Sequence, residues 1–166
     1  NGDNTIIGIH IRRGDYGQGG VYDAITPVEW YLAWLKDNWH TLDDPALFVA
    51  SEDMALVQAF ADYRPYTVET LGITLKAEPY PYYSYLQPDL RSGAPHLLDF
   101  FPEWLMLREC DYLINANSTF SFTAALCSVK AVRMFRPCFA ESRFIEEDCW
   151  ATYPLRKDCP KRRSMT

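Results

Sequence analysis

The chain has 166 residues, enough for one domain with a hydrophobic core and too few for two domains of ordinary size. Its net charge of −6 disfavours a general nucleic-acid-binding protein, and no apolar run approaches the roughly 18 residues of a membrane helix. We therefore expect a single domain over residues 1–166, with no nucleic-acid partner and no membrane span. The sequence begins at Asn1, close to its first strand, which is typical of an excised domain.

The first predicted strand, residues 6–11, is apolar and rich in β-branched residues, and polar residues follow at its end. Because side chains alternate along a strand, His10 and Arg12 share one face and Arg13 points to the other. Two guanidinium groups at the end of a buried strand need an anion or hydrogen-bond acceptors. We expect either an anionic ligand or an internal partner such as Asp15.

Residues 14–25 follow as a loop rich in Gly, Asp and Tyr. The Thr26-Pro27 pair then predicts a helix start, with Thr26 as the N-cap, and apolar residues at helical spacing extend this helix to about Trp39. Residues 46–50, ALFVA, are a short apolar run that is typical of a strand covered on both faces.

The middle of the chain is less regular. A helix is expected to begin at residues 51–53 and to end at Pro65, where proline interrupts the helical hydrogen bonds. Residues 67–68 and 73–77 are candidates for short strands. Residues 78–95 form a long segment rich in Pro and Tyr, and such connections are usually functional or inserted.

The second half of the chain returns to a regular alternation of helix and strand. We expect helix 99–109, strand 112–116, helix 120–128 and strand 131–135, with residues 137–166 packing partly on the domain. This alternation predicts the α/β class, with a Rossmann-like, mainly parallel sheet and flanking helices.

Polar clusters follow three of the predicted strands, and ligands of parallel sheets bind at the carboxyl ends of the strands. Guanidinium groups suit phosphate, a helix amino terminus near Ser118 and Thr119 suits an anion, and the carboxylates of Glu52 and Asp53 suit a purine or ribose hydroxyls. The clusters predict a nucleotide diphosphate site. Taken singly, Asp53 and Ser118 are also ordinary helix N-caps.

Several other kinds of site are disfavoured. The chain has neither a G-x-G-x-x-G motif nor a P-loop motif, and it has no Asp-x-Asp motif that would hold a metal-bound sugar nucleotide. Its five cysteines include no Cys-x-x-Cys pair, which argues against zinc. We expect no metal, free thiols, and buried side chains for Cys110 and Cys127.

Three segments resemble the motifs of one enzyme family. Residues 6–16, IIGIHIRRGDY, resemble the first motif of the α-1,2-fucosyltransferases and the related α-1,6- and protein O-fucosyltransferases. Residues 47–60, LFVASEDMALVQAF, look like their second motif, and residues 101–126, FPEWLMLRECDYLINANSTFSFTAAL, are similar to their third. The segments occur in the family's order and cover most of residues 6–126.

This resemblance implies the carboxy-terminal, donor-binding half of a GT-B glycosyltransferase. Such an enzyme transfers fucose from GDP-fucose to a glycan hydroxyl, with inversion and without a metal or another cofactor. Arg12 corresponds to the family's arginine on the donor diphosphate. The resemblance carries over no general base; Asp15 is our candidate from the residues, and it could equally orient Arg12 or Arg13. The implied donor-binding residues are His10, Arg12, Arg13, Glu52, Asp53, Glu103, Ser118, Thr119 and Phe120.

Two departures from the family pattern leave alternatives open. Glu103 stands where the family usually has Asp, and the amino-terminal acceptor domain that completes a GT-B site is absent from this sequence. The alternatives are a non-catalytic module that binds nucleotide sugars and a glycosyltransferase that uses another GDP-sugar. Enzymes of this family are cytoplasmic in bacteria and face the Golgi lumen in animals; with no anchor visible, we expect the cytoplasm.

Overall fold

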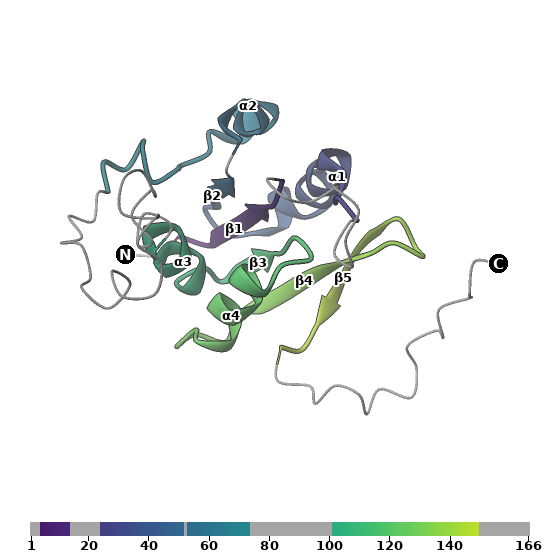
Figure 1. Ribbon diagram of the computed structural model, residues 1–166. Helices are drawn as coiled ribbons and strands as arrows, with labels where there is room; N and C mark the ends of the chain where they lie inside the picture. Colours follow the sequence, from purple (N-terminus) through teal and green to yellow (C-terminus); the bar gives the residue numbers. More distant parts are fainter. Residues whose placement is uncertain (1–3, 14–23, 52, 74–100, 150–166) are drawn as a thin grey trace, which may run out of the picture.

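The computed structural model describes residues 4–13, 24–51, 53–73 and 101–149 (Figure 1). Its sheet has five strands in the order β2-β1-β3-β4-β5. Strands β1 to β4 are parallel, and β5 runs antiparallel to β4 at the edge. The strands are β1 (Ile6–Ile11), β2 (Ala46–Ser51), β3 (Tyr112–Ile114), β4 (Arg133–Cys138) and β5 (Arg143–Glu147).

Helices cover both faces of this sheet, which confirms the α/β class and the mainly parallel sheet. One face packs against α1 (Val28–Asn38), which continues as the 3₁₀ helix η1 (Trp39–Thr41), and against the 3₁₀ helix η2 (Gln58–Tyr63), which follows α2 (Met54–Val57). The other face packs against α3 (Phe101–Arg108) and α4 (Thr119–Leu126). Figure 1 shows α3 and α4 on the side of the sheet opposite α1.

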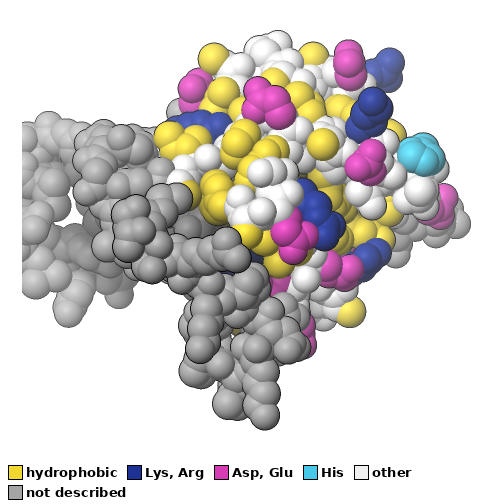
Figure 2. All heavy atoms as spheres, turned by 90° about the vertical axis from the view of Figure 1, so that its right-hand side faces the viewer, with side chains coloured by type: hydrophobic (Ala, Val, Ile, Leu, Met, Phe, Trp, Pro, Cys, Tyr) yellow, Lys and Arg dark blue, Asp and Glu magenta, His cyan; other side chains and the backbone are white. Residues whose placement is uncertain are grey.

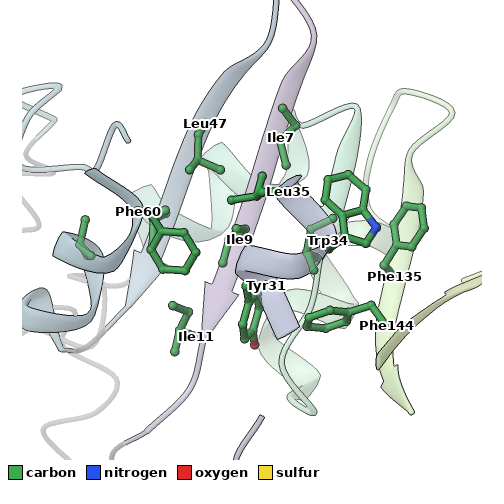
Figure 3. Close-up of a cluster of buried hydrophobic side chains, with 13 residues drawn as sticks. Ile7, Ile9, Ile11, Tyr31, Trp34, Leu35, Leu47, Phe60, Phe135 and Phe144 are labelled. Atoms are coloured by element: carbon green, nitrogen blue, oxygen red, sulfur yellow. The ribbon is translucent and has the colours of Figure 1, made fainter. Parts of the chain in front are cut away.

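The core on the α1 face is aromatic and β-branched. Ile7, Ile9 and Ile11 of β1 point toward Tyr31 and Leu35 of α1 in Figure 3, and all five side chains are fully buried. Since alternate residues of β1 face α1, the prediction that its side chains alternate between two environments is confirmed.

The opposite face of β1 is packed so tightly that it needs a glycine. A Cβ atom built on Gly8 would lie 2.6 Å from Cys110 Sγ and 3.1 Å from Leu107 Cδ2. Cys110 is fully buried directly after α3, and it donates from Sγ to Met106 O. The absence of a side chain at residue 8 therefore lets the end of α3 lie directly on the central strand.

Asp111 joins the start of β1 to the start of β3. Its Oδ2 accepts from the backbone N–H of Ile6 at 2.9 Å, and its own N–H donates to Ile6 O at 2.8 Å. Its other carboxylate oxygen lies 3.2 Å from Lys130 Nζ. The Cys110-Asp111 pair of the third segment thus packs and aligns the central strands.

Several predictions about local structure were wrong. Pro27, and not Thr26, occupies the N-cap position of α1, and no side chain caps this helix. Residues 67–68 belong to a turn in which Thr70 Oγ1 accepts from Thr67 N, and Cys127 is exposed. The four described cysteines are free, as expected, and Cys159 lies outside the described residues.

The carboxy-terminal stretch holds an element that we did not predict. Part of it forms β5, which pairs with β4 from Met134↔Glu147 to Cys138↔Arg143. Phe144 of β5 is buried against Tyr31 of α1, so this stretch does pack on the domain, as expected. The expectations for residues 74–100 and 150–166 fall outside the described residues.

Replacement of Gly8 by Ala tests the tight packing of β1. The new methyl group must displace the buried Cys110 Sγ, so we expect the free energy of unfolding to fall by about 1–3 kcal/mol, measured by urea denaturation. The matched control is the double variant with Cys110→Ala, in which the clash is relieved. Additive losses in the double variant would show that the two side chains do not compete for one space.

Candidate active site

Strands β2, β1 and β3 are neighbours, so the polar clusters that follow them meet at one edge of the sheet. Ile11 at the end of β1 is in register with Ser51 at the end of β2. On the other side, the N–H of Ala116, just after β3, donates to His10 O at 3.0 Å. The ends of the three strands therefore lie together, as predicted.

The strand order makes this edge a topological switch point. The chain passes from β1 to β2 on one side and then returns to β3 on the other side of β1. The loop after β1 and the loop after β3 therefore leave the sheet in opposite directions. Parallel α/β sheets bind their ligands between two such loops. His10 lies on the β1 side of it, and residues 115–118 lie on the β3 side.

His10 is a buried hydrogen-bonding group at this point. Its Nδ1 lies 2.9 Å from Ser121 Oγ of α4, and its ring centroid lies 5.2 Å from that of Phe120. Burial, and secondarily the charge of Arg12, lower the pKa of His10 from 6.5 to about 3. The imidazole is therefore neutral at physiological pH and acts through hydrogen bonds, with one nitrogen as donor and the other as acceptor.

The two arginines after β1 have separate environments. Arg13 donates from Nη2 to Thr26 O at 3.2 Å and from Nη1 to Arg12 O at 3.0 Å, so its guanidinium ties the end of β1 to the start of α1. Arg12 is half-buried, and its charge acts on His10. By strand alternation Arg12 follows the same face as His10, which contacts α4.

Two residues of the predicted site, Asp53 and Ser118, are helix N-caps in this structure. Asp53 caps α2 by accepting from Ala55 N at 2.9 Å, and Ser118 caps α4 by accepting from Phe120 N at 3.3 Å. Thr119 is exposed in the first turn of α4. Asp15 and Glu52, which were also predicted, lie outside the described residues.

Glu103 lies in the first turn of α3, beside α4. Its neighbour Trp104 donates from Nε1 to Thr123 Oγ1 of α4 at 3.1 Å. Burial, and secondarily the charge of Glu69, raise the pKa of Glu103 from 4.5 to about 7. A carboxyl group with such a pKa can accept or donate a hydrogen bond near neutral pH.

Two polar residues that we did not predict lie in a row with His10. Ile9, Ile114 and Phe135 are in register across β1, β3 and β4. The next residue of each strand is His10, Asn115 and Arg136, and these share the α4 face and one level of the sheet. Only the strand register reveals this row, because the sequence separates its members widely.

Asn115 is fully buried, and neither its Nδ2 nor its Oδ1 has a hydrogen-bond partner in the described part of the chain. A buried amide without partners costs about 1–3 kcal/mol. Its backbone N–H donates to Phe135 O at 2.8 Å, so the backbone of residue 115 is held by β4. This unpaired amide lies beside the switch point and lowers the stability of the fold. Its presence there therefore indicates a functional role for this edge.

A groove of about 480 Å³ lies away from this edge, between α1 and β5. Trp30, Trp34 and Phe144 line it, and none of the predicted site residues does. On the face shown in Figure 2, basic and acidic side chains lie next to one another among hydrophobic ones. Arg133 of β4 and Glu146 of β5 form an ion pair at 2.7 Å.

No protein-family model, curated protein or solved structure matches this chain. Among the described residues, no helix has the length and apolar character to cross a membrane. The same residues contain no group of three or more His, Cys, Asp or Glu side chains placed to hold a metal ion.

Replacement of Asn115 by Leu, which has the same branching, tests whether its amide is unpaired. Since the variant removes two buried groups without partners, we expect the free energy of unfolding to rise by about 1 kcal/mol in urea denaturation. Asn38→Leu is the matched control, because Asn38 Nδ2 donates to Trp34 O at 2.7 Å and its removal should bring no gain. Destabilisation by Asn115→Leu would mean that the amide is hydrogen-bonded in solution.

Proposed function

We propose that this chain is the donor-binding domain of a glycosyltransferase that transfers fucose from GDP-fucose to a glycan hydroxyl. One observation carries the proposal. Segments 6–16, 47–60 and 101–126, which resemble the three fucosyltransferase motifs, each contain a strand followed by polar residues, and the ends of these three strands lie at one edge of the sheet, at its switch point. Motifs that serve one ligand should converge in this way.

The edge offers complementary groups for a nucleoside diphosphate. Arg12 brings a guanidinium, which binds phosphate oxygens with two parallel hydrogen bonds. The amino terminus of α4, capped by Ser118, adds backbone N–H groups and a positive helix dipole. The neutral His10 supplies a hydrogen bond, and the Phe120 ring beside it supplies an apolar surface. These groups favour a bound anion that also has uncharged parts.

The same groups suit an inverting transfer without a metal. Negative charge builds up on the departing diphosphate as the bond to the sugar breaks, and Arg12 and the α4 amino terminus can stabilise it. A base must take the proton of the acceptor hydroxyl, and Asp15 is our candidate for this role. We propose that an amino-terminal domain binds the glycan acceptor, and that the enzyme acts in the cytoplasm.

Calorimetric titration tests the proposal directly. We expect GDP, GDP-fucose and GDP-mannose to bind and UDP-sugars to bind at least about tenfold more weakly, because the site recognises the guanosine as well as the phosphates. Arg12→Ala should weaken GDP binding by about tenfold or more, since it removes a charge-assisted contact. A preference for GDP-mannose over GDP-fucose would indicate a glycosyltransferase for another sugar.

The matched control is Arg108→Ala, which removes a guanidinium that is paired with Glu109 at the end of α3. It should leave GDP affinity within about twofold of the unchanged chain. Absence of GDP binding, or equal affinity after Arg12→Ala, would refute the proposed donor site. Binding of GDP-fucose without transfer, in a chain that includes its amino-terminal domain, would instead identify a non-catalytic binding module.

A further inference from the structure

Arg136 brings a cation to the edge site that the sequence motifs do not include. It lies on β4, one residue beyond Phe135, which is in register with Ile114 of β3. It therefore stands at the level of Asn115 and next to it, on the face that α4 covers. Its guanidinium carbon lies 5.5 Å from the centroid of the Phe122 ring of α4, which places the charge beside that helix.

The Arg136 guanidinium joins two parts of the fold. Its Nη2 donates to Asn117 Oδ1 at 3.1 Å, and its Nη1 lies 3.3 Å from Glu147 Oε2 of β5. One planar group thus connects the turn after β3 to the antiparallel edge strand. Its side chain is 37% exposed, so solvent reaches the guanidinium.

The turn that Arg136 contacts is the one that presents the amino terminus of α4. Its first residues are fixed by the sheet, because Asn115 N donates to Phe135 O and Ala116 N donates to His10 O. Ser118 then caps α4: its Oγ accepts from Phe120 N, and its backbone carbonyl accepts from Phe122 N. Asn117 lies between residues 115–116, which are hydrogen-bonded to the sheet, and the cap residue Ser118. Its side-chain oxygen accepts from Arg136.

We propose that Arg136 is a positioning residue for the donor site: through Asn117 it fixes the turn from which Ser118 and the α4 amino terminus meet the ligand's phosphates. This inference rests on the proposed function for the ligand, and on the described contacts for the turn. A fork-shaped guanidinium suits the task, since it can hold two acceptors on different elements at once.

The experiment combines amide hydrogen exchange with GDP titration of the same variants. Arg136→Ala should speed exchange of the Phe120 and Phe122 amides by about tenfold, because the cap residue loses its support. It should also weaken GDP binding by about tenfold. Arg136→Lys keeps the charge but not the planar fork, so it should restore only part of the affinity.

Arg133→Ala is the matched control, since it removes the partner of Glu146 from the same strand without touching the turn. It should change neither the exchange of the two α4 amides nor the affinity. Asn117→Ala removes the acceptor and keeps the Arg136–Glu147 pair, so it should reproduce the effect even if Arg136→Ala does not fold. The two substitutions should be non-additive in a double variant.

The outcomes separate this inference from the proposed function. Unchanged exchange in both Arg136→Ala and Asn117→Ala would overturn the inference, and so would faster exchange with unchanged GDP affinity. If the unsubstituted chain binds no GDP, the proposed function fails, and the exchange data alone decide whether Arg136 holds the turn.

Discussion

The position of β1 between β2 and β3 is the constraint on which the structure depends. This strand is buried on both faces, and it is hydrogen-bonded along both edges. Gly8 lets α3 approach it, and Asp111 aligns its start with β3. Because parallel neighbours are held in register from their starts, their polar ends meet at one edge. The site is thus a consequence of how the central strand is packed.

Much of this arrangement could be predicted from the sequence, because it depends on local patterns. The apolar runs of β1 and β2 and the strand-helix alternation identify the sheet, and the residues after each strand identify the edge. What could not be predicted depends on long-range pairing. β5 is short, and three of its five residues are charged, so only its pairing with β4 reveals it. The row of His10, Asn115 and Arg136 likewise exists only through the register of three strands.

The same long-range contacts change the chemical character of the predicted residues. The burial of His10, together with the charge of Arg12, makes it a neutral group that is hydrogen-bonded to Ser121. Arg13 follows the opposite face from Arg12, as alternation predicts, and it donates to Thr26 O before α1. Burial, and secondarily the charge of Glu69, raise the pKa of Glu103 to about 7. The proposed donor site therefore combines one cation from β1, a helix amino terminus and neutral polar groups, with Arg136 as support.

The central claim is that GDP binds at the switch point, against His10 and the start of α4. Nitrogen-15 NMR of the histidine side chains during a GDP titration tests it most directly, because His40 on the exposed η1 provides an internal reference. We predict that the His10 imidazole signals shift in a saturable way with GDP while those of His40 stay constant. Saturable GDP binding that leaves the His10 signals unchanged would contradict the account.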